Sequence, residues 1–267
     1  MKTNPFLLIA LILISLLLLN FTLPEKNFKP IGTVQVNDKL YFEETEVSNR
    51  DWKAYETWNK QMHGDASAAH ISALPDTTVW KKEINDYDEY VNGYYNKIKF
   101  INCPVVGISW EQANAYCKWK TESANRELAE KPIELNYRLP TVAEWKLAAK
   151  AGYSQKLQKT IDKKGYPFNK LHNIVVYDST YKGLNKEEVN PNASITAPVD
   201  MYFPNKYGIF NLFGNVAEMT AEEGVAKGGS WNHTEEEVAL EKHQSYEKAT
   251  AWLGFRCICE VKWNTSQ

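Results

Sequence analysis

Four cysteines carry the most reactive side chains of this 267-residue chain: Cys103, Cys117, Cys257 and Cys259. Thiolates bind soft ions such as Cu(I), and pairs of thiols form disulfides in oxidising compartments. Four cysteines allow three pairings, which their spacing alone does not separate. Cys257 and Cys259 share one face if their segment is a strand, so this Cys-x-Cys pair is a candidate copper ligand set.

Two histidines, His233 and His243, form a second candidate for metal chemistry, because neutral imidazole binds copper and zinc. They stand ten residues apart in an acidic segment. The glutamates between them are Glu235, Glu236, Glu237 and Glu241. This spacing matches no recognised zinc motif. The pattern therefore favours a solvated acidic surface over a metal site.

The segment 208–218 is dense in glycine and asparagine and ends in a glutamate. Both residue types tolerate positive φ, so the backbone can turn tightly and direct carbonyl oxygens toward a ligand. Asn215 and Glu218 add an amide and a carboxylate, which are donors that calcium prefers. The alternative is that these two side chains only cap a turn.

Three capping signals along the chain predict the starts of short helices, which would position these groups. The capping pairs are Ser48 with Asp51, Ser109 with Gln112, and Thr141 with Glu144. Trp52, Tyr55 and Trp58 follow the first signal with the apolar spacing of a helix, and residues 104–108 have the pattern of a buried strand. Capped helices alternating with strands and long loops indicate a compact α+β domain.

The amino terminus has the pattern of a targeting segment. Phe6 to Leu19 is an apolar run interrupted only by Ser15. Its length suits the core of a signal peptide better than the ~20 residues that span a bilayer. Apolar residues continue to residue 23 without a small-x-small cleavage site. We therefore expect residues 1–23 to be either a cleaved signal peptide or a retained anchor, with membrane anchoring through residues 6–23 in the second case.

Composition limits the classes of partner. The net charge is −2 and no long basic run occurs, so no nucleic-acid partner is expected. The 43% hydrophobic and 13% aromatic content is enough for one substantial core. The sequence contains no glycine-rich phosphate loop, zinc-protease motif or hydrolase nucleophile elbow.

Four segments carry a family resemblance when they are taken in order. They are residues 137–145 (YRLPTVAEW), 207–218 (YGIFNLFGNVAE), 228–231 (GGSW) and 254–257 (GFRC). Through them the chain resembles the formylglycine-generating enzyme, or sulfatase-modifying factor, family. The resemblance implies a single α+β domain with the family's irregular, loop-rich fold, which is similar to that of C-type lectins.

The resemblance also sets the expected boundaries. The family domain is expected at 41–263, after a linker at 24–40 and before a tail at 264–267. Residues 60–100, rich in aspartate, asparagine and tyrosine, are expected to be a variable insertion within it.

The chain departs from the family at the two cysteines that bind Cu(I) and engage the substrate cysteine. Family enzymes place them five residues apart, just after Gly-Gly-Ser. Here those positions hold His233 and Val238, and neither side chain supplies a thiolate. We therefore expect no copper and no formylglycine synthesis, and we expect Trp231 beside the emptied positions to contribute to binding.

Two structural features are also implied by the resemblance. The family's disulfide corresponds to Cys117 and Cys257, which leaves Cys103 and Cys259 for a second pair. The family holds structural calcium through two segments. Their counterparts here are Asn173, Ile174, Gly214, Asn215, Val216 and Glu218.

The resulting hypothesis is a non-catalytic, exported domain that acts as a binding or scaffold module in the periplasm or cell envelope. Its expected partner is a protein, peptide or glycan. Similar domains, some without the cysteines, occur in gliding-motility and type IX secretion lipoproteins, which suggests a role of that kind.

Two alternatives stay open. One is an oxidoreductase that acts on a protein cysteine with other ligands, for example Cys257 and Cys259. The other is calcium-dependent, lectin-like binding.

Overall fold

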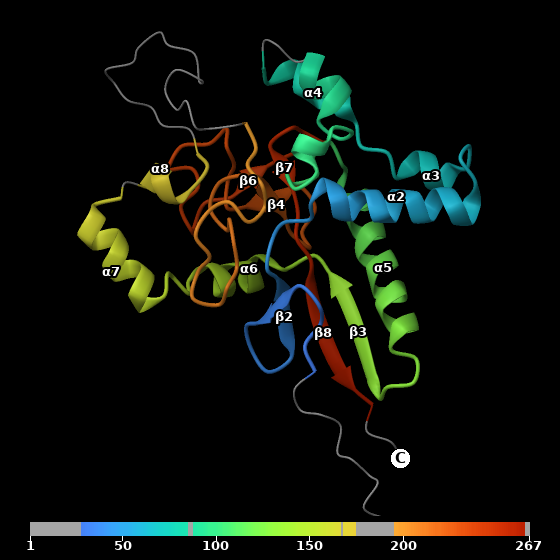
Figure 1. The fold of residues 1–267 in the computed structure, drawn as a ribbon, viewed down its shortest axis with the longest axis horizontal. Coiled ribbons are helices and arrows are strands. Elements are labelled where there is room, and N and C mark those ends of the chain that lie inside the picture. Colours follow the sequence, from blue (N-terminus) through green and yellow to red (C-terminus); the bar gives the residue numbers. More distant parts are fainter. Residues whose placement is uncertain (1–27, 85–87, 167, 175–194, 265–267) are drawn as a thin grey trace, which may run out of the picture.

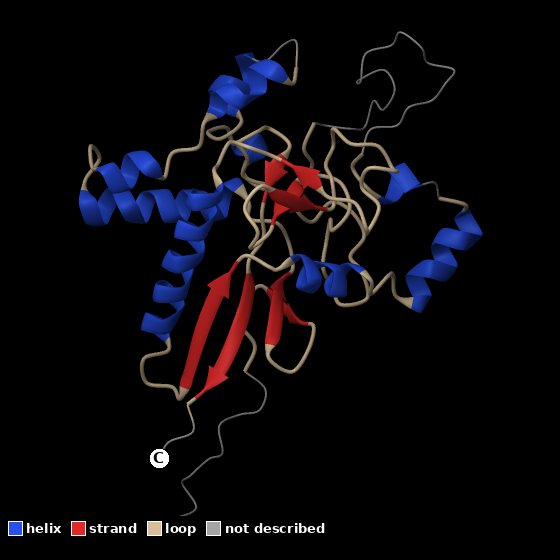
Figure 2. Cartoon of the chain, turned by 180° about the vertical axis from the view of Figure 1, so that it is seen from behind, coloured by secondary structure: helices blue, strands red, loops and turns tan. Residues whose placement is uncertain are grey.

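A computed structural model describes residues 28–84, 88–166, 168–174 and 195–264. The expected signal segment at 1–23 lies outside the described residues. The described chain forms an α+β fold in which two small sheets meet helices and long loops (Figures 1 and 2). The predicted fold class is confirmed.

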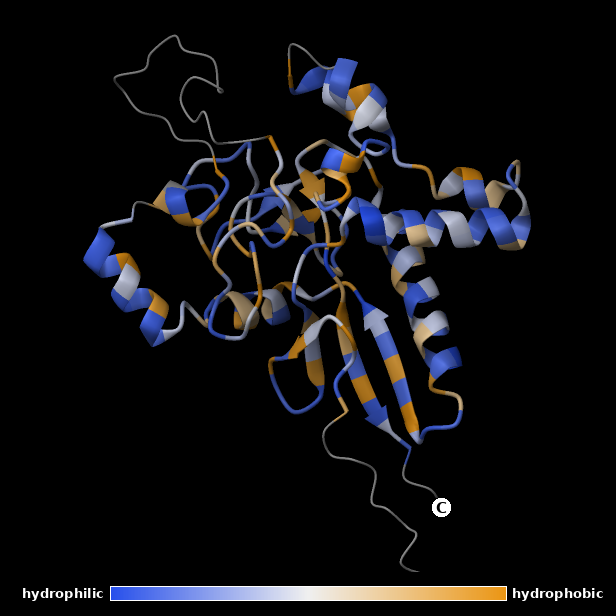
Figure 3. Cartoon of the chain, viewed as in Figure 1, coloured by the Kyte–Doolittle hydropathy of each residue, from blue (hydrophilic) through white to orange (hydrophobic). Residues whose placement is uncertain are grey.

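The first sheet contains the longest strands and has the order β1-β2-β8-β3, with every pair antiparallel. Its strands are β1 (Thr33–Gln35), β2 (Leu40–Glu43), β3 (Ile133–Arg138) and β8 (Ile258–Trp263). Along β3, buried and more exposed residues alternate, and Figure 3 shows hydrophobic and hydrophilic residues alternating along the same strand. One face of the sheet therefore packs into the core and the other meets solvent.

The long helix α5 (Trp110–Glu127) lies beside β3 and closes its outer edge. The Asn125 amide accepts from the Leu135 N–H and donates to its carbonyl, each at 2.8 Å. The Thr121 hydroxyl makes the same pair of bonds to Tyr137. Side chains thus satisfy an edge that would otherwise present unpaired backbone groups.

The second sheet has the order β6-β5-β4-β7 and carries the cleft described below. Its strands are β4 (Ala217–Met219), β5 (Val225–Lys227), β6 (Gln244–Ser245) and β7 (Leu253–Gly254). Only the β4–β7 pair is parallel.

The three predicted capping boxes are all present. They begin α2 (Asn49–His63), α5, and α6 (Val142–Ala149). Two further helices, α7 (Gln155–Lys164) and α8 (Phe168–Leu171), follow α6. Trp52 of α2 is fully buried and stacks on Tyr116 of α5, which fixes the two helices against one core.

The insertion expected at 60–100 folds into short helices. They are the end of α2, α3 (Ala68–Ser72), η1 (Thr77–Lys82), α4 (Asp88–Gly93) and η2 (Ile98–Phe100). Trp80 of η1 is fully buried and packs against Tyr94 and Trp231. The segment is therefore anchored in the core beside the Gly-Gly-Ser-Trp turn.

The linker expected at 24–40 needs correction, because Thr33–Gln35 of this range forms strand β1 and pairs with β2. The Asn37 side chain accepts from the Leu40 N–H at 3.1 Å and stabilises the turn between the two strands. Val34 packs against the second core cluster. A two-strand hairpin was missed because its apolar segment is only three residues long.

Candidate functional site

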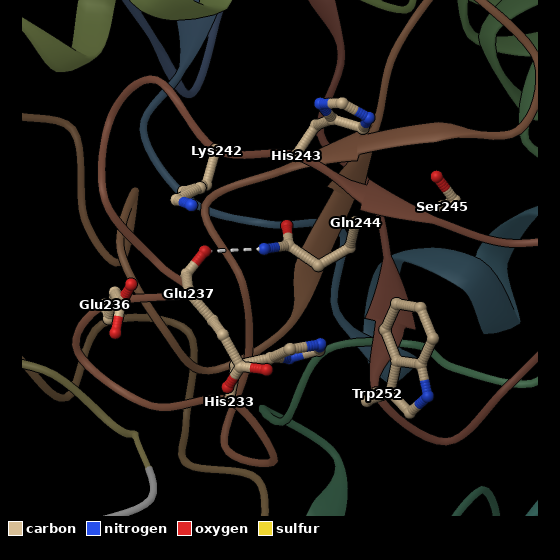
Figure 4. A pocket seen from close by; sticks show the side chains of 8 residues that line it. All are labelled: His233, Glu236, Glu237, Lys242, His243, Gln244, Ser245 and Trp252. Atoms are coloured by element: carbon tan, nitrogen blue, oxygen red, sulfur yellow. Dashed lines mark hydrogen bonds between the residues drawn. The ribbon is translucent and has the colours of Figure 1, made fainter.

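A cleft of about 280 Å³ opens beside the turn that follows β5 (Figure 4). Its lining residues are His233, Glu236, Glu237, Lys242, His243, Gln244, Ser245 and Trp252. They come from the loop after β5, from β6 and the residues before it, and from the residue before β7. None of these described lining residues is a cysteine, so the cleft offers an indole ring and polar groups, not thiols.

The Gly228-Gly229 turn directly follows β5, and both residues have positive φ, +84° and +62°. A Cβ on Gly228 would lie 2.4 Å from the Leu212 carbonyl oxygen. A Cβ on Gly229 would lie 2.4 Å from Cγ1 of Val238. Glycine is therefore required at both positions by conformation and by space.

His233 occupies the first of the two family cysteine positions and lies in the cleft. Its Nδ1 is 2.7 Å from the Ser230 hydroxyl oxygen. Its ring meets Trp252 edge to face, with 5.1 Å between the ring centroids. These contacts hold the imidazole in one orientation against the aromatic wall.

Val238 occupies the second family cysteine position and points into the core. Its side chain is 1% exposed and packs against Gly229. The two positions therefore do not converge on one open point: His233 meets solvent and Val238 supports the turn from behind. The valine side chain at this position packs against the turn and has no thiol that could bind copper.

A buried lysine fixes the loop that forms one wall of the cleft. Lys227 is 1% exposed, and its ammonium group donates to the carbonyls of Leu240, at 2.7 Å, and Lys242. Burial lowers the pKa of Lys227, and the charge of Lys146 lowers it further. The ammonium thus ties the loop 238–243 to β5 through charge-assisted hydrogen bonds.

Gln244 of β6 makes the corresponding bonds on the other side of this loop. Its Oε1 accepts from the Gly229 N–H at 3.0 Å, and its Nε2 donates to the Glu237 carbonyl at 2.8 Å. The wall of the cleft is therefore held by polar bonds from both neighbouring strands.

Trp231, predicted as a binding residue, lies elsewhere. It is 5% exposed, its indole N–H donates to the Ala251 carbonyl, and its ring stacks on Trp80 with centroids 6.2 Å apart. The aromatic wall of the cleft is Trp252, which the sequence reasoning missed. Its position two residues before Gly-Phe-Arg-Cys was the only available signal.

Cys117 and Cys257 are brought together as expected from the family. Their sulfur atoms are 3.2 Å apart, and both thiols are free and buried. Burial raises the pKa of Cys257, and the neighbouring Cys117 raises it further. A buried neutral thiol is a poor nucleophile, and these two thiols lie side by side.

Cys103 and Cys259 are not brought together. Cys103 packs with Trp80 and Tyr94 in one core cluster, whereas Cys259 packs in another beside Tyr137. Burial raises the pKa of Cys103 to about 11 and that of Cys259 to about 12. Both are free, buried thiols, and neither lines the cleft.

Glu218, one of the predicted calcium ligands, is fully buried and paired with Arg256. The guanidinium contacts both carboxylate oxygens, with the shortest N–O distance at 2.5 Å. The Trp145 indole N–H donates to the same carboxylate at 2.8 Å. These contacts join β4, α6 and the Gly-Phe-Arg-Cys segment through one buried ion pair.

The two predicted calcium segments meet at Asn215. Its backbone N–H donates to the Asn173 carbonyl at 2.8 Å, and its side-chain oxygen accepts from the Ala197 N–H at 2.8 Å. Gly214 approaches so closely that a Cβ would lie 2.4 Å from the Asn173 carbonyl oxygen. Ile174 and Val216 are buried beside them. The structure therefore brings the two predicted segments together, while the Glu218 carboxylate is paired with Arg256.

Glu46 completes this polar network and was missed by the sequence reasoning. Its carboxylate accepts from the side-chain amides of Asn215, at 2.9 Å, and Asn211, at 3.2 Å. The residue is fully buried and forms no ion pair with a described residue. Burial raises the pKa of Glu46 to about 8, although the charge of Arg256 opposes the shift.

The donor set fits a hard cation in part. The buried Oδ1 atoms of Asn173 and Asn211 have no hydrogen-bond partner among the described residues, and a cation would use such oxygens. The Glu218 carboxylate is already engaged by Arg256, whereas the Glu46 carboxylate has no ion pair with any residue that the structure describes. Residues 175–194, which follow Ile174, lie outside the described residues.

The described residues contain neither a clustered metal-ligand set nor a membrane-spanning helix. No group of three or more histidine, cysteine, aspartate or glutamate side chains is arranged there to hold a metal ion. No helix in that part of the chain is long and apolar enough to cross a bilayer.

The fold and the site define an α+β domain with a cleft beside the Gly-Gly-Ser turn. The profile described as "Sulfatase-modifying factor enzyme 1-like domain" matches residues 17–261. The chain therefore belongs to this family, and the resemblance carried by the four motifs is confirmed.

The relatives include named enzymes and named inactive proteins. The chain is 28% identical to the formylglycine-generating enzyme of Thermomonospora curvata, over 85% of this chain and 73% of that protein. It is 30% identical to the inactive Cα-formylglycine-generating enzyme 2 of Bos taurus, over 62% of this chain and 52% of that protein. The chain thus spans about half the length of the bovine relative.

Among solved structures, the chain is similar to CarF, with a TM-score of 0.54 and 17% identity over 84% of this chain and 87% of that one. At this identity the likeness concerns the fold alone.

Proposed function

We propose that this domain recognises a polypeptide segment and does not oxidise one. The observation that carries the proposal is the placement of sulfur. All four thiols are buried within the core, while the cleft beside Gly-Gly-Ser is lined by His233, Trp252 and polar side chains. Copper oxidation of a cysteine needs accessible thiolates that bind Cu(I).

The cleft has the features of a recognition site. One aromatic face supplies contact area at low entropic cost, and the surrounding amide, imidazole, ammonium and carboxylate groups supply orientation. Lys227 and Gln244 fix its wall before any ligand arrives, which reduces the ordering cost of binding.

Copper titration tests the proposal that this domain does not oxidise a polypeptide. The reduced, folded protein is titrated with Cu(I) in competition with a chromogenic chelator, and the formylglycine-generating enzyme of Thermomonospora curvata serves as the matched control. We expect the control to withdraw copper and this protein to leave it with the chelator. Withdrawal of one equivalent by this protein would contradict the proposal.

We also propose export to the periplasm or cell envelope, where the recognised polypeptide segment would belong to an envelope protein. The apolar run from Phe6 to Leu19 supports this localisation. Fractionation of cells with N-terminal sequencing of the product tests it. A mature N-terminus near residue 24 indicates cleavage, an intact N-terminus in the membrane fraction indicates an anchor, and recovery in the cytoplasm contradicts export.

A structural calcium ion remains a further proposal, supported by the unpartnered oxygens of Asn173 and Asn211. Bound calcium would stabilise the native state according to its affinity and concentration. We expect the Tm to rise with millimolar calcium and to return with EDTA, and we expect Asn211→Ala to abolish the rise. An unchanged Tm under both conditions would contradict the proposed calcium site.

A further inference from the structure

The helix α7 and its surroundings concentrate positive charge. Residues 146–174 contain seven lysines and a single aspartate, whereas the whole chain has a net charge of −2. Figures 1 and 2 show α7 at the edge of the molecule, away from both sheets. The exposed lysines of this helix are Lys156, Lys159, Lys163 and Lys164. None of these four lines the cleft, so this charged surface is separate from the site described above.

Three of the lysines share one face of α7. With 3.6 residues per turn, Lys156, Lys159 and Lys163 fall within a sector of about 60° around the helix axis. Ile161 lies on the other side of the helix and is buried. The three side chains therefore form a lysine stripe that faces away from the core.

The described residues do not neutralise this lysine stripe. None of its three ammonium groups forms an ion pair with a residue that the structure describes. Asp162, the acidic residue of the helix, accepts instead from the Gln158 side-chain amide at 2.8 Å.

Such a stripe does not stabilise the helix that carries it. Like charges three or four residues apart repel one another on a helix surface. Lys156 also places a positive charge in the first turn, where the helix dipole favours a negative one. The arrangement is therefore better explained by an anionic partner outside the chain.

A loop that borders the start of α7 adds an apolar component. The Asn205 side-chain amide donates to the Ala148 carbonyl of α6 at 2.9 Å. The Lys206 N–H donates to the Gly152 carbonyl, two residues before the N-cap of α7, at 2.7 Å. The loop 201–206 thus lies against the connection between α6 and α7.

This neighbouring region exposes large apolar side chains beside the positive charge. They are Leu147, Met201 and Phe203, which are 44%, 60% and 41% exposed. At a bilayer surface, lysines attract anionic headgroups while apolar side chains enter the boundary between headgroups and acyl chains. The combination of the two favours a lipid surface over a soluble anion.

We propose that the lysine stripe of α7 binds a membrane surface that contains anionic phospholipids, with the exposed apolar side chains of α6 and the loop 201–206 at the headgroup boundary. This contact uses neither the cleft nor the thiols. It is therefore independent of the proposed polypeptide recognition, and each can fail without the other.

Reductive methylation of lysines, quantified residue by residue with mass spectrometry, tests where the membrane contacts the protein. The full chain is mixed with vesicles of phosphatidylcholine, alone or with phosphatidylglycerol. We expect the anionic vesicles to slow methylation of the lysine stripe about threefold or more, and to leave the exposed Lys39 and Lys118 unchanged. This readout is local, so it does not depend on whether the N-terminal segment is retained.

Two outcomes of the methylation experiment would overturn the proposal. One is an equal methylation rate of the stripe with neutral and anionic vesicles. The other is stronger protection by heparin or polyglutamate than by anionic vesicles, which would assign the stripe to a soluble polyanion.

Two triple variants with the same loss of charge supply the matched control. The stripe variant combines Lys156→Gln, Lys159→Gln and Lys163→Gln. The control variant replaces three scattered, exposed lysines, by Lys39→Gln, Lys118→Gln and Lys248→Gln. Both keep exposed polar side chains, so we expect neither to lower the melting temperature.

A polarity-sensitive dye on Thr160→Cys compares the two variants. Thr160 is exposed on α7, and the four native thiols are buried. We expect anionic vesicles to shift the dye emission to the blue in the parent and control proteins, and the stripe variant to lose this shift. The same shift in both triple variants, or its absence from the parent protein, would contradict membrane binding by α7.

Discussion

Glu46 illustrates what single residues contribute to this domain. Its carboxylate is fully buried and accepts two amide hydrogen bonds, yet it makes no ion pair with a described residue. Burial favours the protonated acid, because a charge in the core loses its hydration. Glu46 therefore destabilises the folded state at pH values at which its carboxyl group is ionised in the unfolded chain but protonated in the folded chain.

This cost gives stability a pH dependence with a defined sign. The pKa of Glu46 rises from 4.5 to about 8 on folding, so the unfolded state binds fewer protons between these values. The free energy of unfolding then falls as pH rises from about 4.5 to 8, by up to about 1.4 kcal/mol per pH unit. We expect Glu46→Gln to flatten this slope in urea titrations at pH 5 and pH 8. Parallel pH profiles of the two proteins would show that Glu46 does not titrate in this window.

At the scale of elements, the edge of β3 depends on side chains of α5. Asn125 satisfies both backbone groups of Leu135, and Leu135 is buried. Asn125→Ala should therefore lower the free energy of unfolding by about 1–3 kcal/mol, because a buried N–H and C=O lose their partners.

The matched control on the same helix is Glu122→Ala, at an exposed position. We expect it to change stability by less than about 0.5 kcal/mol. Denaturant unfolding of both variants checks the difference. Similar values for the two would mean that water replaces the Asn125 bonds without loss.

The elements that sequence reasoning found are those encoded locally. Ser48, Ser109 and Thr141 each begin a helix because a capping box needs only four consecutive residues. Contacts between segments that are distant in the sequence cannot be predicted from such local patterns. Trp231 and Trp252 are both tryptophans near family motifs, and only the packing of Trp80 on Trp231 decides which one reaches the cleft. Glu46 was missed for the same reason, since its partners are more than 160 residues away.

At the scale of the whole molecule, the cysteines connect distant parts of one core. Cys117 of α5 and Cys257 before β8 lie with their sulfur atoms 3.2 Å apart, whereas Cys103 and Cys259 sit in different clusters. In an oxidising compartment we expect one bridge, between Cys117 and Cys257. A bridge closing about 140 residues would add up to about 4–5 kcal/mol of stability in the chain-entropy model.

Thiol titration of the unfolded, unreduced protein measures this arrangement. We expect two reactive thiols in the native sequence and none in the double variant Cys103→Ser with Cys259→Ser. Zero thiols in the native sequence would indicate the second bridge between Cys103 and Cys259. Four reactive thiols would show that Cys117 and Cys257 stay reduced.

The central claim is that the cleft beside Gly228-Gly229-Ser230 recognises a partner without oxidising it. The most direct measurement incubates the purified chain with Cu(I), oxygen and a sulfatase-type Cys-x-Pro-x-Arg peptide, and follows the peptide mass. The formylglycine-generating enzyme of Thermomonospora curvata is assayed in parallel under the same conditions. We expect an unchanged peptide with this chain and an aldehyde product with the control. Aldehyde formation by this chain would contradict it.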